Sequence, residues 1–349
     1  MTKNKCGRDC KKCSMHKNSC LGCSMCDVGF CKCGSENKKR CMVICPKKFG
    51  SFALVKSIEN KDKLLANNDI ELSGYIPIMP DRTRTTFDFS KVNNTIAIHG
   101  EFLLTSAGDE VSPIYRMRGF QRTLNIYGVN GILEFYVKDR ALEGFWSNRH
   151  FIYNQLKNMN FSGIITPNFS LYEDAPRIEH LYNIQRVKIM YNEMIKAGLP
   201  AILDVVWATV EDLEYWIKEI NQSNIKVIAF SFMNVDTRLK ASNAWRHYLL
   251  GYKFLISRIS PNIKIIVAGI SSTKRIEEIE AISKNREISF MHQASWINSR
   301  KGFLSEVKKQ VSKLEMSKDE IFQRNLYYYS DFISEIKNRQ FSDLKNKNY

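Results

Sequence analysis

Cysteine is absent from residues 46–349, and all ten cysteines of this 349-residue chain lie between Cys6 and Cys45. The chain also lacks an apolar run of about eighteen residues, which argues against a membrane-spanning helix. Its polar N-terminus lacks the apolar stretch of a secretory signal peptide. We therefore expect a cytoplasmic protein with no membrane partner, in which thiols stay reduced and available to metals.

Two nucleotide-binding signatures are also missing. Neither G-x-G-x-x-G nor a P-loop occurs, which lowers the expectation of a dinucleotide-binding fold or an NTPase.

Acidic residues are in the minority. The chain has 52 Lys and Arg against 36 Asp and Glu, a formal net charge of +16. The first fifty residues hold twelve of the basic and three of the acidic residues, so more than half of the excess lies there. Such an excess favours a polyanionic partner, most often nucleic acid. The alternative is a Lys-rich composition without a specific partner, and metal-bound thiolates would cancel part of the charge.

The cysteines are spaced as metal ligands. They form two triplets, C-x3-C-x2-C and C-x2-C-x2-C, followed by C-x-C and by C-x3-C-P. Fifty polar residues cannot build a hydrophobic core, so we expect residues 1–50 to be a small module that folds around metal. The expected ligands are Cys6, Cys10, Cys13, Cys20, Cys23, Cys26, Cys31, Cys33, Cys41 and Cys45.

The spacing leaves the metal open. C-x2-C-x2-C followed by a remote Cys-Pro resembles the bacterial ferredoxin pattern for a [4Fe–4S] cluster, so iron–sulfur clusters are the first expectation. Zinc is the alternative, because the segment is basic and basic zinc modules are common on nucleic-acid enzymes. The first triplet also matches the radical-SAM spacing. That reading is less favoured, since Lys12 fills the position of the usual aromatic residue and no strand precedes the triplet.

The stretch "CGRDCKKCSMHKNSCLGC" resembles a small Cys-rich family that begins C-G-x-D-C-x-x-C and continues with C-x-G-C. The resemblance implies metal binding and supplies no reaction.

The rest of the chain alternates short β-rich runs with amphipathic stretches. Seven such runs, from "NTIAIHGEFLL" to "REISFMHQASW", are apolar without clean alternation, which favours a parallel sheet covered by helices. We predict an α/β fold with a (β/α) barrel-like sheet, complete or incomplete, and keep an open doubly wound sheet as the competitor. The predicted organisation is a metal module at 1–50, a linker with an extended segment at 51–84, the barrel-like domain at 85–305 and a helical tail at 306–349.

Active residues of such barrels lie at the C-terminal ends of the strands. Three side chains there are candidate catalytic groups, namely Glu134, Asp204 and His292. A carboxylate inside an apolar run is costly unless it is paired or functional, so Glu134 and Asp204 are either acid–base groups or halves of structural pairs. His292 is either catalytic or satisfied by a hydrogen bond in the core.

A second set of residues is expected to bind substrate. "GISST" precedes a predicted helix, and the N–H groups there are suited to phosphate, although an ordinary capped turn has the same sequence. Asn168 and Asp174 are alternatively helix caps, and the two tryptophans are alternatively packing residues. The expected substrate- or phosphate-binding residues are Asn168, Ser170, Trp207, Trp296, Ser271 and Ser272.

The phrases "GIITPNFSLYEDAP", "PAILDVVWAT" and "VIAFSF" resemble a domain of unknown function that occurs on phages, plasmids and integrative elements. The resemblance covers roughly residues 163–272. Asn168 stands where that family often has Asp, which puts an acidic role at this position in doubt. The resemblance implies a mobile-element setting and hence association with DNA, and it supplies no reaction.

Three functions remain open. The first is a metal-containing, mobile-element-associated enzyme that modifies or hydrolyses nucleic acid through barrel carboxylates. The second is a non-catalytic DNA-binding or replication-associated protein. The third is an iron–sulfur redox or radical enzyme acting on a small molecule. The charge favours the first two functions, and the cysteine spacing favours the third.

Overall fold

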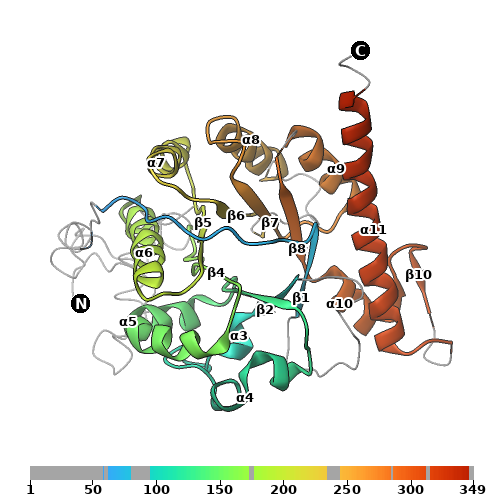
Figure 1. The fold of residues 1–349 in the computed structure, drawn as a ribbon, viewed down its shortest axis with the longest axis horizontal. Helices are drawn as coiled ribbons and strands as arrows, with labels where there is room; N and C mark the ends of the chain where they lie inside the picture. The colour runs from blue at the N-terminus through green and yellow to red at the C-terminus, as the bar shows by residue number, and fades with distance from the viewer. Residues whose placement is uncertain are drawn as a thin grey trace, which may run out of the picture.

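A computed structural model of the chain describes residues 58, 62–79, 95–172, 177–233, 244–283, 286–311 and 315–345. The strands β1–β8 form a closed barrel, in which every strand runs parallel to its neighbours and β8 pairs with β1 (Figure 1). The predicted (β/α) barrel is therefore confirmed, and it is complete. The doubly wound alternative is wrong, because that sheet is open.

The barrel strands are short and buried. They are β1 (Tyr75–Met79), β2 (Thr95–His99), β3 (Asn130–Glu134), β4 (Gly163–Ile165), β5 (Ala201–Asp204), β6 (Val227–Ser231), β7 (Lys264–Ala268) and β8 (Ile288–His292).

Helices cover the outer face of the barrel. They are α3 (Gly100–Leu103), α4 (Pro113–Leu124), α5 (Asp139–Leu156), α6 (Arg177–Lys196), α7 (Val210–Asn221), α8 (Ala244–Ile256), α9 (Thr273–Ile282), α10 (Ala294–Arg300) and α11 (Lys318–Lys345), with a 3-10 turn at Lys157–Met159 and a hairpin of β9 (Phe303–Leu304) and β10 (Lys309–Gln310). Gly198 follows α6 with a φ of +78°, as expected for the glycine that ends a helix. In the described part of the chain, no helix is both long enough and apolar enough to cross a bilayer.

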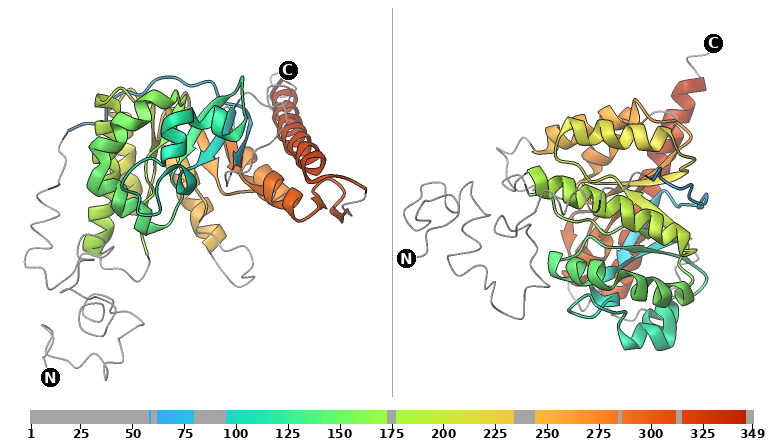
Figure 2. Two further views of the ribbon diagram at one scale, coloured as in Figure 1. Left: turned by 90° about the horizontal axis from the view of Figure 1, so that it is seen from below. Right: turned by 90° about the vertical axis from the view of Figure 1, so that its left-hand side faces the viewer.

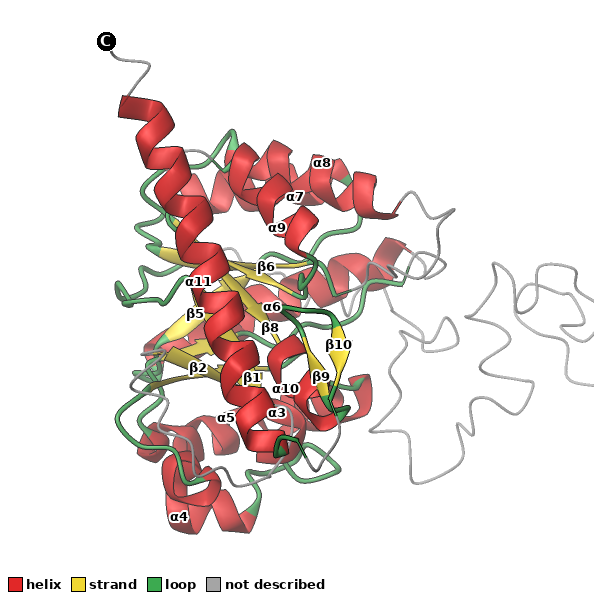
Figure 3. Cartoon of the chain, turned by 90° about the vertical axis from the view of Figure 1, so that its right-hand side faces the viewer, coloured by secondary structure: helices red, strands yellow, loops and turns green. Residues whose placement is uncertain are grey.

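The last helix packs against α10 and α9 at one side of the barrel. Figure 2 shows α11 on the opposite side of the molecule from α5 and α6. Figure 3 shows it crossing in front of β1 and β8, with the β9–β10 hairpin beside its first half. Lys337 of α11 donates a hydrogen bond of 2.6 Å to the backbone oxygen of Ile288, which fastens the helix to β8.

The first strand comes from the segment that the sequence indicated as an extended approach to the barrel. β1 contains Pro77, which faces His292 of β8 in the sheet register. Proline has no N–H to give to a ladder, and it normally lies at strand edges or bulges, so the sequence argued against a strand here. The barrel nevertheless uses this strand to close between β8 and β2, because the buried Ile76 and Ile78 complete its interior.

The barrel interior is a separate apolar cluster. It holds small and β-branched side chains, and its members alternate along each strand with residues that face the helices, as the pleat requires. The interior residues are Ile70, Ile76, Ile78, Ala97, Ile132, Ile165, Ile202, Val227, Ala229, Ile266, Ala268 and Met291. This alternation decides which side chains at the strand ends face inward.

Candidate active site at the barrel mouth

Three ionisable side chains close the interior at the C-terminal end of the strands. His99 ends β2, Glu134 ends β3 and Asp204 ends β5. Each lies two residues after a member of the interior cluster, so each side chain points inward. The structure therefore brings the predicted Glu134 and Asp204 together and adds His99 to them.

Asp204 is fully buried and fully hydrogen-bonded. Its Oδ1 accepts a hydrogen bond from the hydroxyl of Tyr136 at 3.2 Å, and its Oδ2 accepts one from the amide of Asn168 at 2.6 Å. Its backbone N–H donates to the hydroxyl oxygen of Thr166 at 3.0 Å. Tyr136 and Asn168 are half-buried, so they lie between this carboxyl group and the solvent.

Burial raises the pKa of Asp204 to about 7, against the lowering effect of the hydrogen bonds from Asn168 and Tyr136. The negative charge of Glu134 adds to the rise. A carboxyl group with such a pKa exchanges protons near neutral pH, which is the property required of a general acid or base.

Glu134 is paired with His99. Oε1 of Glu134 is hydrogen-bonded to Nδ1 of His99, and Oε2 accepts the backbone N–H of Tyr136 at 2.7 Å. Tyr136 therefore contacts both carboxylates, Glu134 through its backbone and Asp204 through its hydroxyl. Burial alone would lower the pKa of His99, but the hydrogen bond and charge of Glu134 outweigh it, and the pKa is raised.

A chain of charges continues outward from this pair. Nε2 of His99 lies 3.6 Å from Oε2 of Glu101, and Nζ of Lys138 donates to Oε1 of Glu101 at 2.6 Å. The carboxylates on both sides of His99 favour its charged form.

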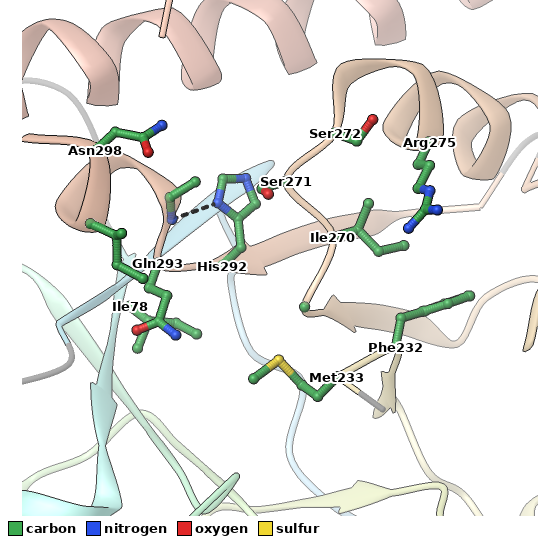
Figure 4. Close-up of a pocket in the computed structure, with 13 residues that line it drawn as sticks. Ile78, Phe232, Met233, Ile270, Ser271, Ser272, Arg275, His292, Gln293 and Asn298 are labelled. Atoms are coloured by element: carbon green, nitrogen blue, oxygen red, sulfur yellow. Dashed lines mark hydrogen bonds between the residues drawn. The ribbon is translucent and has the colours of Figure 1, made fainter. Parts of the chain in front are cut away.

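Three further predicted residues lie in a pocket at the ends of β6, β7 and β8. Its volume is about 610 Å³, and it is lined by Ser271, Ser272 and His292 together with Arg275 (Figure 4). Ile78 of the interior cluster also lines it, so the pocket borders the interior on the side away from β3 and β5.

His292 does not lie with Glu134 and Asp204. It lies two residues after Phe290 on β8, so its side chain points to the same side of the sheet as Phe290, toward the helices. The centre of its ring lies 4.7 Å from that of Tyr75 and 4.6 Å from that of Tyr329. Burial lowers the pKa of His292 to about 3, so the imidazole is neutral near pH 7. Of the three predicted catalytic residues, Glu134 and Asp204 thus lie at the barrel mouth, whereas His292 lines the neighbouring pocket.

The remaining predicted residues are mainly in packing contacts. Trp207 stacks on His247 at 4.8 Å, and a Cβ at Gly251 would approach its ring to 2.3 Å, so the ring and α8 fit closely. Trp296 packs edge-on against Phe322 of α11 and is only 2% exposed, which leaves no open ring face for a base. The hydroxyl of Ser170 donates to Asp139 at 2.6 Å, which joins the loop after β4 to the first residue of α5.

The predicted metal ligands lie outside the described part of the chain. All ten cysteines lie in residues 1–57, which the structure does not describe. Among the described residues, no group of three or more His, Cys, Asp or Glu side chains is arranged to hold a metal ion.

Sequence reasoning missed His99, Tyr136 and Arg275. His99 ends the run "TIAIH", so it had the same signal as Glu134 and Asp204, a polar residue after an apolar strand. Tyr136 carried no such signal, because its role depends on a contact with a residue 68 positions away.

The central part of the chain matches the model of a protein family. The model of the family described as "Domain of unknown function (DUF4417)" matches residues 106–284, just over half of the chain. The chain belongs to the DUF4417 family.

A phage protein is similar to part of the chain. The chain is 24% identical over 133 residues to "Gene 1 protein" of Mycobacterium phage L5, which covers 38% of this chain and 55% of the phage protein. The chain thus spans about half the length of that curated relative. The two matches confirm the resemblance to a phage-associated domain of unknown function, and they leave the resemblance of the Cys-rich segment untested.

The DUF4417 match covers most of the barrel mouth. Residues 106–284 include Glu134, Tyr136 and Asp204, whereas His99 and His292 lie outside the match. The carboxylates therefore belong to the family region, and both histidines come from flanking segments of this chain.

Proposed function

We propose that this DUF4417 protein is an enzyme that cleaves or modifies nucleic acid by acid–base catalysis at the barrel mouth. The observation that carries the proposal is the meeting of His99, Glu134 and Asp204 at the C-terminal end of a closed parallel barrel, the end where barrel enzymes have their active sites. A purely structural pair would need no third ionisable group facing the same interior.

Asp204 is the proposed proton-exchanging group. It is fully buried, so it exchanges protons with a bound substrate through the hydroxyl of Tyr136. Burial raises the pKa of Tyr136 far above neutrality, and the charges of Asp204 and Glu134 add to this, so the relay stays a neutral hydroxyl. Glu134 and Asn168 hold the relay and the carboxyl group in place.

Nucleic acid is the proposed substrate for two reasons. The net charge of +16 favours a polyanion, and the similarity of part of the chain to a protein of Mycobacterium phage L5 supports a phage-associated setting.

We also propose that residues 1–50 bind metal through their cysteines, as [4Fe–4S] clusters or as zinc. The triplet spacing supports this proposal, and the basic residues around the cysteines would contact the phosphate backbone.

The test compares Asp204→Asn with Glu280→Gln. Glu280 is a matched control, because burial also raises its pKa to about 7, but it lies in α9 and faces Lys337 rather than the mouth. Single- and double-stranded DNA and RNA are incubated with each protein, and the products are analysed by mass spectrometry.

We expect Asp204→Asn to lower turnover by about a hundredfold or more, since general acid–base groups contribute that much. Glu280→Gln should keep turnover, and thermal unfolding should show both variants folded. Turnover that survives Asp204→Asn would contradict the proposal. Binding without any product from the unmodified protein would favour a non-catalytic nucleic-acid-binding protein.

A further inference from the structure

We propose that the pocket at the ends of β6, β7 and β8 binds a phosphate group, carried by a nucleotide or by the end of a nucleic-acid strand. Arg275, the first N–H groups of α9 and Nε2 of His292 would hold it. The inference deepens the proposed function and rests on it for the class of substrate.

The charge of the pocket is suited to an anion. Among the described residues that line it, Arg275 is the only charged one, and no Asp or Glu is present. The guanidinium of Arg275 lies 4.4 Å from the centre of the Trp245 ring, which fixes its direction. A rigid guanidinium without a competing carboxylate in the pocket is a typical phosphate-binding group.

The N-terminus of α9 supplies further donors. The helix begins at Thr273, and Ser272 at its N-cap makes no side-chain hydrogen bond to the first turn. The first N–H groups of a helix have no partners within the helix, and the helix dipole favours negative charge there. Ser271 and Ser272 are exposed and line the pocket, so these N–H groups are accessible from it.

A buried donor on the facing wall points independently to a ligand. His292 is 3% exposed, and its Nε2 has no hydrogen-bond partner among the described residues. Its Nδ1 accepts the backbone N–H of Ala294 at 3.3 Å, so the proton of the neutral ring lies on Nε2. Figure 4 shows this second nitrogen on the edge of the ring nearer Ser271. A buried N–H without a partner is costly, and an anion in the pocket would satisfy it.

The pocket is large enough to hold more than the phosphate. Its volume of about 610 Å³ is within the range of small-molecule sites, so a nucleoside attached to the phosphate fits as well. Ile78 connects the pocket to the barrel interior, so a substrate held here by its phosphate would extend toward Tyr136 and Asp204.

The experiment measures binding by calorimetry on the full chain. The ligands are inorganic phosphate, a nucleoside 5′-monophosphate, and one oligonucleotide with and without a 5′-phosphate. The variants are Arg275→Gln and His292→Phe, and the second keeps an aromatic ring between Tyr75 and Tyr329. Arg258→Gln is the matched control, because Arg258 also stacks on an aromatic ring, that of Phe254, at 3.7 Å, but lies outside the pocket.

We expect Arg275→Gln to weaken the binding of phosphate and of the monophosphate by about tenfold or more, since a charge-assisted hydrogen bond is lost. His292→Phe should weaken binding less, and Arg258→Gln should leave it unchanged. If the site binds the phosphate at the end of a strand, the 5′-phosphorylated oligonucleotide should bind more tightly than its unphosphorylated form. If the site binds a free nucleotide, the two oligonucleotides should bind equally.

Absence of phosphate binding, or equal losses in Arg275→Gln and Arg258→Gln, would overturn the inference. Asp204→Asn separates the two proposals, because it should bind phosphate like the unmodified protein. If Arg275→Gln loses phosphate while Asp204→Asn keeps turnover, the phosphate site stands and the acid–base role of Asp204 fails.

Discussion

At the scale of the residue, the central feature is a pair of carboxyl groups with different partners. Glu134 faces the base His99, whereas Asp204 faces the neutral donors Tyr136 and Asn168. The two carboxyl groups of one site thus differ in their partners, and it is Asp204 whose pKa burial raises to about 7.

One prediction concerns the coupling of His99 to Glu134. The substitution Glu134→Gln removes the charge and the charged acceptor that raise the pKa of His99, so this pKa should fall, while the charge of Glu101 remains. The histidine ring signals followed by NMR over pH give the value directly. An unchanged pKa of His99 in the variant would show that the two side chains are not paired in solution.

A second prediction concerns stability and pH. The pKa of Asp204 rises from 3.8 to about 7 on folding, so the folded state holds the proton more tightly. Stability from this group is present below pH 3.8 and is lost as the pH rises through 7, by up to about 4 kcal/mol. The free energy of unfolding of Asp204→Asn should therefore fall less than that of the unmodified protein between pH 4 and pH 8.

The free energy of unfolding, measured by chemical denaturation, should also fall less in Glu280→Gln than in the unmodified protein between pH 4 and pH 8. The reason is the same, because burial raises the pKa of Glu280 to about 7. Parallel curves for Asp204→Asn and the unmodified protein would mean that Asp204 is ionised over the whole range.

At the scale of the element, the end of the barrel away from the mouth is closed by the segment before β1. The amide of Asn67 donates to the backbone oxygens of Ala201 at 3.3 Å and Val227 at 2.8 Å, and its oxygen accepts the N–H of Lys226 at 2.7 Å. One buried side chain thus joins the starts of β5 and β6.

Asn67→Ala should therefore lower the free energy of unfolding by about 2 kcal/mol or more, because buried backbone groups lose their partners. The neighbouring Asn68 is exposed and is the matched control, so Asn68→Ala should change stability by less than about 0.5 kcal/mol. Urea denaturation measures both. Equal effects of the two substitutions would contradict the closing role of Asn67.

The elements also show what a single sequence can predict. The strands β2–β8 are apolar runs between amphipathic helices, so local patterning sufficed for the barrel. The strand β1 was missed because Pro77 contradicts local strand rules, and only closure of the barrel explains it. Asp204 was found because a carboxylate in an apolar run is conspicuous. Asn67 and Tyr136 depend on distant partners, which no local pattern reveals.

At the scale of the whole molecule, the chain combines a basic Cys-rich segment with a barrel that has ionisable side chains at its mouth. The net charge of the first fifty residues is +9, within a chain of +16. Binding to nucleic acid through such charge releases counterions, so it weakens steeply with salt.

The full chain should therefore bind nucleic acid with a steep decrease of affinity as salt increases, and Asp204→Asn should give the same slope. Fluorescence anisotropy over a salt series measures this. Anaerobic purification with iron and zinc analysis tests for the proposed metal, and its removal should weaken binding, because we propose that residues 1–50 fold around it. Salt-independent binding, or a chain free of metal, would contradict this part of the account.

The most direct test of the central claim is the titration of Asp204 itself. The side-chain carboxyl carbon of Asp204 is assigned by comparison with Asp204→Asn, and its chemical shift is followed by ¹³C NMR over pH. The account predicts a pKa of about 7, and a further rise in Tyr136→Phe, which removes a hydrogen bond that lowers it. A pKa near 4 in both proteins would contradict the account, because Asp204 would then be an ordinary ionised carboxylate at neutral pH.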